Sequence, residues 1–247
     1  SIIDVTKIAW HENVDGAGTF GAARVITHLS EGPRALYAAD LDRDGDLDVL
    51  AASSGDDLKK KGISLYQKQE FAKAAQSFGS ASKAYEKAKD MGNAADCAYN
   101  QGMCLGKAEG VDPLDQAKAY DRAALLYGKA KQGDKQLNAL IAGAQVYLRV
   151  GDLPKAEAIY AKAEPLAKKL KKPLLQGLAT EGLAKVAMTR GQIGQATELF
   201  KKAAPLVKNS VSASVRVDLQ IAACIQKNGD FGGALAICDG AIAKAAP

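Results

Sequence analysis

Small and large apolar residues recur at helical spacing over most of the chain, and one alanine position returns about every 40 residues. A large side chain follows that alanine four residues later, as Tyr160 follows Ala156, which places both on one helix face. A period of this size indicates an array of helical hairpins. The recurring positions are Ala74, Ala117, Ala156, Ala196 and Ala234, and the large residues after them are Phe78, Tyr160, Phe200 and, more weakly, Cys238.

A turn signal precedes the alanine in several copies: Gly151-Asp152, Gly191-Gln192 and Gly229-Asp230. Glycine can adopt the left-handed conformation that ends one helix, and Asp can cap the next. We therefore expect five antiparallel hairpins that pack most closely at the alanine, where a larger side chain would cost about 1–3 kcal/mol. The expected helix pairs are 58–67 with 70–91, 93–108 with 113–133, 135–150 with 153–171, 173–190 with 193–208, and 212–227 with 231–246.

The first 57 residues have a different pattern. Short apolar runs at 2–10, 24–29, 34–39 and 47–52, separated by turn residues such as Asp15-Gly16, predict a small β meander. This stretch carries a net charge of −7, whereas the remainder carries +12, and together they give the chain its +5. The contrast predicts two units, residues 1–57 and residues 58–247.

An Asp-rich loop lies between the last two expected strands. Its carboxylates fall on alternate positions, and Gly45 allows a sharp turn, so the loop offers the oxygen ligands that Ca²⁺ prefers. It is not an EF-hand, because Ala51 stands where that motif needs a glutamate.

The helical repeats resemble the tetratricopeptide repeat (TPR). Three copies carry the motif in order: Gly62, Phe71, Ala74, Phe78 and Ala81; Tyr147, Gly151, Ala156, Tyr160 and Ala163; Gly191, Ala196, Phe200 and Ala203. The resemblance implies a mainly α protein in which residues 58–247 form an α-α superhelix, a TPR-like solenoid of about five helical hairpins. The period exceeds the usual 34 or so residues, and in this the hairpins are similar to those of the soluble attachment-protein (SNAP) family of vesicle fusion.

The N-terminal stretch resembles one FG-GAP/VCBS repeat, a blade unit of calcium-binding β-propellers. The resemblance rests on Ile8–Asn13, Gly18–Gly21 and the Asp-rich loop. It implies calcium ligands at Asp40, Asp42, Asp44, Asp46 and Asp48, with Asp46 binding through its carbonyl. The alternative is that a solitary blade, in a fold that uses about 4–8 of them, binds no metal.

The TPR resemblance also implies a concave face lined by the first helix of each hairpin. The repeat register places a mostly basic, lightly aromatic set there, which would suit an acidic helix or an extended acidic peptide. The alternative is an ordinary solvated surface. The predicted groove residues are Lys59, Tyr66, Tyr99, Lys107, Gln145, Arg149, Glu181, Lys185, Arg216 and Lys227.

Further lysines gather near the ends of the second helices, where the helix dipole favours cations. They could also form a positive edge for peripheral association with an acidic membrane surface. Nucleic acid is not expected as a partner, because no basic stretch is interleaved with aromatic residues. These lysines are Lys83, Lys87, Lys89, Lys129, Lys131, Lys135, Lys162, Lys168, Lys169, Lys171, Lys172, Lys201, Lys202 and Lys208.

The sequence gives little support for an enzyme. The two histidines, His11 and His28, lie in the acidic stretch without a partnered nucleophile, and no phosphate loop or zinc spacing occurs. The chaperone-binding carboxylate clamp of TPR proteins is also not expected, since Ile63 stands where the clamp needs Asn, although Lys59 matches. Cys97, Cys104, Cys224 and Cys238 form no C-x-x-C pair and are expected to be free thiols in a reducing compartment.

We therefore expect a non-enzymatic protein–protein interaction scaffold or adaptor, intracellular, without a transmembrane segment or small-molecule cofactor, acting within a larger assembly. Two alternatives are a SNAP-like adaptor in vesicle fusion and a calcium-dependent binding module that uses the Asp-rich loop.

Overall fold

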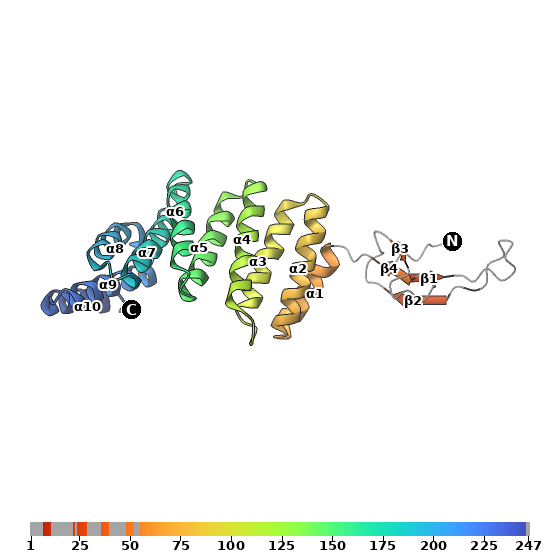
Figure 1. Ribbon diagram of the computed structural model, residues 1–247, viewed down its shortest axis with the longest axis horizontal. Coiled ribbons are helices and arrows are strands. Elements are labelled where there is room, and N and C mark those ends of the chain that lie inside the picture. Colours follow the sequence, from red (N-terminus) through yellow and green to blue (C-terminus); the bar gives the residue numbers. More distant parts are fainter. Residues whose placement is uncertain are drawn as a thin grey trace.

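The computed structural model describes residues 7–10, 22, 24–28, 36–39, 48–51 and 55–245. Ten helices of the described chain follow one another as antiparallel hairpins along the long axis of the molecule (Figure 1). The hairpins are α1 (Gly55–Gln67) with α2 (Phe71–Lys87), α3 (Met91–Leu105) with α4 (Pro113–Lys129), α5 (Gly133–Arg149) with α6 (Leu153–Lys169), α7 (Pro173–Thr189) with α8 (Ile193–Val207), and α9 (Val211–Lys227) with α10 (Phe231–Ala245).

The helix ends follow the expected cap chemistry. Asp112 precedes Pro113, the first residue of α4, and accepts a hydrogen bond from the Leu114 amide. Asp152 accepts one from the Lys155 amide at the start of α6. Gly151 ends the preceding helix with a φ of +84°, a left-handed conformation that costs glycine little. These local signals mark the starts of α4 and α6 and the turn between α5 and α6.

The core confirms the close packing predicted at the recurring alanines. Ala74, Ala117, Ala156 and Ala196 are completely buried, and Ala234 nearly so. The large residues four positions later, Phe78, Tyr160 and Phe200, are buried as well. Three successive clusters of such residues form a continuous core through the stack.

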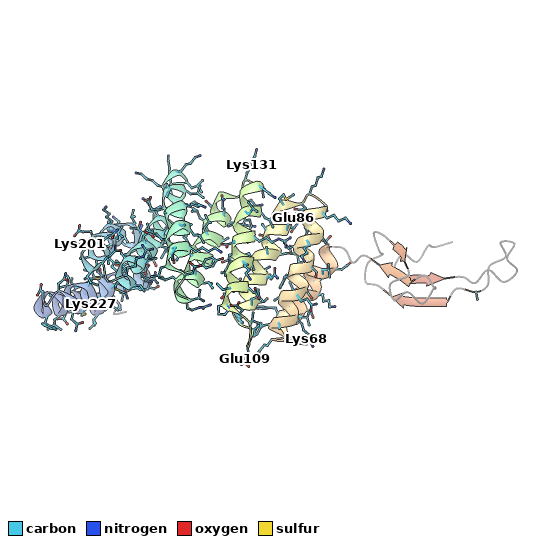
Figure 2. The ribbon with its side chains drawn as sticks, in the orientation of Figure 1. Lys68, Glu86, Glu109, Lys131, Lys201 and Lys227 are labelled. Atoms are coloured by element: carbon cyan, nitrogen blue, oxygen red, sulfur yellow. The ribbon has the colours of Figure 1, made fainter. Side chains whose placement is uncertain are left out.

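The first helices of the last three hairpins share one face of the stack, since α7 contacts both α5 and α9 as well as its own partner α8. The turns alternate between two edges. In Figure 2, Glu86 and Lys131, near turns between hairpins, lie at one edge, and Lys68 and Glu109, in turns within hairpins, lie at the opposite edge. The face made by α5, α7 and α9 holds the candidate site.

The described strands of the N-terminal region pair in two separate sets. β1 (Lys7–Trp10) pairs antiparallel with β2 (Arg24–His28), and β3 (Leu36–Ala39) pairs antiparallel with β4 (Asp48–Ala51). The expected single meander is therefore not shown by these residues, which give two-stranded pairs only.

A candidate partner-binding groove

Five of the predicted groove residues meet in one hollow of about 560 Å³ on the face formed by α5, α7 and α9. Gln145 and Arg149 come from α5, Glu181 and Lys185 from α7, and Arg216 from α9. Three successive first helices thus contribute to one site, as the repeat register predicted. The remaining lining residues are Leu148, Tyr160, Leu174, Leu178, Gly182, Ser210, Ser212 and Ala213.

Glu181 is the structural centre of this groove. It was predicted as an exposed groove residue, and that exposure is wrong, because its side chain is only 3% accessible. Its carboxylate accepts hydrogen bonds from Arg216 Nε and Nη2 at 2.7 and 2.8 Å. The ammonium group of Lys185, one turn along α7, lies 2.7 Å from the same carboxylate. The two cations compensate the charge that burial would otherwise disfavour.

The titration of Glu181 follows from these contacts. Burial acts to raise its pKa, but the hydrogen bonds and positive charges of Arg216 and Lys185 outweigh burial, so the pKa lies below its ordinary value. The bond to Glu181 in turn raises the pKa of Arg216. At neutral pH the group is therefore one carboxylate that holds two cations in fixed positions.

Arg149 is held separately. Its Nη2 donates a hydrogen bond of 2.8 Å to Oε1 of Gln116, a buried residue of α4. Arg149 itself is exposed at the end of α5. With Lys185 and Arg216, it gives the groove three cations against the single carboxylate of Glu181.

The start of α9 adds polar groups to the same groove. Ser210 caps this helix by accepting a hydrogen bond from the Ala213 amide, and Ser212 is exposed beside it. The amino end of a helix carries a partial positive charge. Leu148, Leu174 and Leu178 supply apolar surface nearby. The groove therefore combines positive potential with apolar walls.

Two further predicted residues lie near the other end of the stack. Tyr66 lines a smaller cavity of about 220 Å³ together with Ile63, Met103 and other residues of the first two hairpins. The ammonium group of Lys107 donates a hydrogen bond to the Tyr66 hydroxyl and lies 4.6 Å from the centroid of the Tyr66 ring. This Lys–Tyr pair is thus held by internal contacts.

Lys59, Tyr99 and Lys227 lie outside both hollows. Lys59 Nζ donates a hydrogen bond of 2.9 Å to Asn93 Oδ1, and the Tyr99 ring packs against the Tyr120 ring with centroids 5.2 Å apart. Lys227 is exposed in the last turn of α9, toward the C-terminal end of the stack (Figure 2). The predicted groove is therefore not one uniform channel, because its members occupy separate places.

The apolar wall of the groove and its two serines, Ser210 and Ser212, were not predicted from the sequence. Leu174 and Leu178 lie seven and three residues before Glu181, on the same helix face, so helical spacing could have identified them. Tyr160 was identified as a core residue, but its ring also lines the groove from α6. The role of Gln116 could not be predicted from helical spacing. It belongs to the second helix of a hairpin, and it contributes only by accepting a hydrogen bond from Arg149.

The Asp-rich loop cannot be placed in this way. Asp40, Asp42, Asp44 and Asp46 lie outside the described residues, and Asp48 is the first residue of β4. Among the residues that are described, no group of three or more His, Cys, Asp or Glu side chains could hold a metal ion. The calcium ligands stay a prediction.

Comparisons with known proteins agree with both resemblances. Residues 4–51 match the FG-GAP-like repeat family, which covers the N-terminal stretch only. No curated protein matches the chain significantly.

Solved structures with TPR-like folds superpose on most of the chain. A Rap protein crystallised with competence and sporulation factor is 16% identical, with a TM-score of 0.58, and the match covers 77% of this chain and 54% of that one. The apo form of RapI gives a TM-score of 0.68 at 11% identity, with 77% and 53% coverage. MamA gives 0.58 at 15% identity, with 77% and 91% coverage.

These similarities show that the helical part has a TPR-like fold, and at such low identity they show the fold alone. The chain spans about half the length of the two Rap proteins. Within the described residues, no helix has the length and apolar character needed to traverse a bilayer.

Proposed function

We propose that the helical array is a non-catalytic protein-binding module and that its α5–α7–α9 groove holds an acidic segment of a partner protein. The TPR-like fold supports protein binding in general. The observation that carries the finer proposal is the buried Glu181, which fixes Arg216 and Lys185 beside Arg149.

Preorganisation is the reason why this arrangement favours binding. Long basic side chains lose rotamer entropy when a ligand immobilises them, at about 0.5–1.5 kcal/mol each. The carboxylate of Glu181 and the amide of Gln116 already hold Arg216, Lys185 and Arg149. A partner carboxylate therefore meets cations that are largely ordered in advance, and hydrogen bonds between charged groups are stronger than those between neutral groups.

The leucines of the groove indicate the form of the partner segment. Leu148, Leu174 and Leu178 offer apolar contact beside the cations. An amphipathic acidic helix or an extended peptide with alternating Glu and Leu would match both features. Charge complementarity of this kind mainly speeds association and weakens as salt rises.

Peptide binding to single-residue variants of the full chain tests the proposal. The probe is a fluorescein-labelled peptide of Glu and Leu, with a Lys–Leu peptide of the same length as its counterpart. Arg149→Glu should weaken binding of the acidic peptide about tenfold, which is about 1.4 kcal/mol. Lys169→Glu, the same charge change at an exposed position in the last turn of α6, is the control.

Two results would contradict the groove assignment. Equal losses in Arg149→Glu and Lys169→Glu would mean that only the total charge matters. Binding of both peptides alike would mean that charge does not select the partner.

A second candidate function concerns residues 1–57. The FG-GAP-like match over residues 4–51 and the carboxylate spacing from Asp40 to Asp48 favour a calcium-dependent module. Titration of Ca²⁺ into the full chain by calorimetry should give binding heat that Asp42→Asn with Asp44→Asn abolishes. A role as a SNAP-like adaptor in vesicle fusion is a more specific form of the scaffold proposal, and it stays a prediction.

The two stretches are also proposed to be separate units. Residues 58–247 expressed alone should give a helical circular dichroism spectrum and a cooperative thermal transition, because they contain more than the three or so repeats that a stable stack needs.

A further inference from the structure

The Tyr160 hydroxyl, in the floor of the α5–α7–α9 groove, differs from the hydroxyls of three other buried tyrosines. Each of those three donates a hydrogen bond to an aspartate: Tyr85 to Asp56, Tyr127 to Asp96 and Tyr147 to Asp121. Tyr160 is only 2% exposed, and among residues 55–245 its hydroxyl has no hydrogen-bond partner. Because a buried hydroxyl without a partner is unfavourable, this one calls for a partner from outside the chain.

The packing of Tyr160 places its hydroxyl end at the groove. The ring lies so close to Gly182 of α7 that a Cβ atom there would collide with Cζ, the ring atom that carries the hydroxyl. Both Tyr160 and Gly182 line the hollow. Burial and the negative charge of Glu181 raise the pKa of Tyr160, so the hydroxyl keeps its proton at neutral pH. The groove therefore contains a hydrogen-bond donor that the chain itself does not use.

Further donors from α7 and α9 line the same hollow. Arg216 meets Glu181 through Nε and Nη2, which leaves the protons on Nη1 for a ligand. The Lys185 ammonium group has three protons, and one carboxylate oxygen of Glu181 engages it. The Ser212 amide, in the first turn of α9, has no acceptor within its own helix. Together with Tyr160 of α6, these donors lie on three helices and can surround a ligand.

The charge of the groove fits a phosphate group better than a single carboxylate. Its lining residues carry three cations and the one carboxylate of Glu181, which leaves two positive charges. A phosphoserine side chain carries about −1.5 to −2 charges at pH 7 and has three strong acceptor oxygens. A carboxylate carries one charge and has two oxygens. A phosphate group can therefore compensate the charge of the groove and also accept a hydrogen bond from the Tyr160 hydroxyl.

We propose that the acidic segment held in this groove carries a phosphoserine, a specificity that rests on the function proposed above for the same groove. The phosphate accepts a hydrogen bond from the Tyr160 hydroxyl and forms ion pairs with Arg216 and Lys185. The Ser212 amide supplies a further donor at the positive end of α9. The leucines of the groove then contact apolar residues that flank the phosphoserine.

Three fluorescein-labelled peptides test this specificity on the full chain. They share one sequence of Glu and Leu and differ at a central position, which is serine, phosphoserine or glutamate. In fluorescence anisotropy, the phosphoserine peptide should bind about tenfold more tightly than the glutamate peptide, the gain expected from one further hydrogen bond to a charged group. Inorganic phosphate lacks the leucine contacts and should compete weakly. Competition as strong as that of the unlabelled phosphoserine peptide would make free phosphate the ligand and overturn the proposal.

Tyr160→Phe removes the hydroxyl and keeps the ring. It should weaken binding of the phosphoserine peptide about tenfold and leave the affinity for the serine peptide unchanged. The thermal transition should stay close to that of the parent, because the hydroxyl has no partner among residues 55–245. Tyr147→Phe is the matched control, since Tyr147 is equally buried but donates to Asp121 and does not line the groove. It should lower stability and leave the preference for phosphoserine intact.

Two results would overturn phosphoserine recognition and leave the acidic-segment groove in place. One is equal affinity for the phosphoserine and glutamate peptides, with both weakened by Arg149→Glu. The other is a preference for phosphoserine that Tyr160→Phe does not reduce. Affinities for all three peptides that Arg149→Glu leaves unchanged would instead contradict the proposed function of the groove, and the phosphoserine site with it. Tight binding to vesicles that contain phosphatidic acid, lost in Tyr160→Phe, would assign the phosphate to a lipid and overturn the choice of a protein segment.

Discussion

The carboxylate of Glu181 accepts hydrogen bonds from Arg216 Nε and Nη2, at 2.7 and 2.8 Å, and so joins α7 to α9 across the face that these helices form with α5. The two residues are 35 positions apart and belong to different hairpins. Because the guanidinium group is planar and meets both carboxylate oxygens, the contact fixes the direction of Arg216 as well as its distance. One buried side chain thus sets the relation between successive repeats and the charge of the groove.

We expect Glu181→Gln to lower the free energy of unfolding at pH 7 by about 1.5–3 kcal/mol, the range for hydrogen bonds to charged groups. Arg216 and Lys185 keep partial access to solvent, so the loss should be smaller than for a fully buried pair. Urea denaturation measures it. Glu198→Gln, which removes an exposed carboxylate from α8, is the control and should change stability little.

The contribution of Glu181 should depend on pH in a defined direction. Its folded-state pKa lies below its ordinary value, so its stabilisation is complete above the unfolded-state pKa of about 4.3. It is lost as the pH falls through the folded-state pKa. The difference in stability between the parent and Glu181→Gln should therefore stay constant from pH 7 to about 5 and narrow below about 4. A constant difference down to pH 3 would show that folding does not lower the pKa of this carboxylate.

The burial of Glu181 was not predictable from the sequence. The helical register placed this residue on the correct face, but it could not give its depth, because the neighbours that cover it come from other helices. The equivalent position in α9 is Leu219, which is 44% exposed although it is apolar. How deeply a residue is buried in the stack depends on the side chains of the next repeat, and the local sequence pattern gives no information about those contacts.

The recurrent features were predictable because they are local. The alanine at each helix crossing and the left-handed Gly151, Gly191 and Gly229 each follow from steric rules within a few residues. Helix starts were less accurate: α1 begins at Gly55 and α3 at Met91, each a few residues before its expected start. Lys89 and Lys131 take left-handed conformations between hairpins, where no glycine marks the turn.

Ala156→Leu should destabilise the protein by about 1–3 kcal/mol, because Ala156 is completely buried at a helix crossing and extra methylene groups overpack it. Thermal or urea denaturation measures the change. Ala158→Leu on the exposed side of α6 gives the matched control and should be nearly neutral. Equal effects in both variants would mean that the crossing has free volume at Ala156.

Gly182→Ala should both destabilise the protein and disturb the groove. A Cβ atom at Gly182 would lie 2.3 Å from ring atoms of the buried Tyr160, so the ring or α7 must move. This cost exceeds the gain of about 0.5–1 kcal/mol that alanine brings to a helix. Gly240→Ala in α10 is the control, since no atom within 4 Å opposes its Cβ, and it should be stabilising. If Gly182→Ala were as stabilising as Gly240→Ala, the contact with Tyr160 would be wrong.

Gln69→Gly should stabilise the first hairpin. Gln69 occupies the turn between α1 and α2 with a φ of 61°, the position that Gly151 fills between α5 and α6. A left-handed residue with a Cβ atom costs about 1–2 kcal/mol, and glycine relieves this at an entropic cost of about 0.5–1 kcal/mol. The net gain should therefore be up to about 1 kcal/mol. Gln76→Gly, at an exposed position inside α2, should instead destabilise by about 0.5–1 kcal/mol. Opposite signs for these two substitutions in urea denaturation would assign the gain to the backbone conformation at residue 69, whereas a loss in both would show that the turn does not strain Gln69.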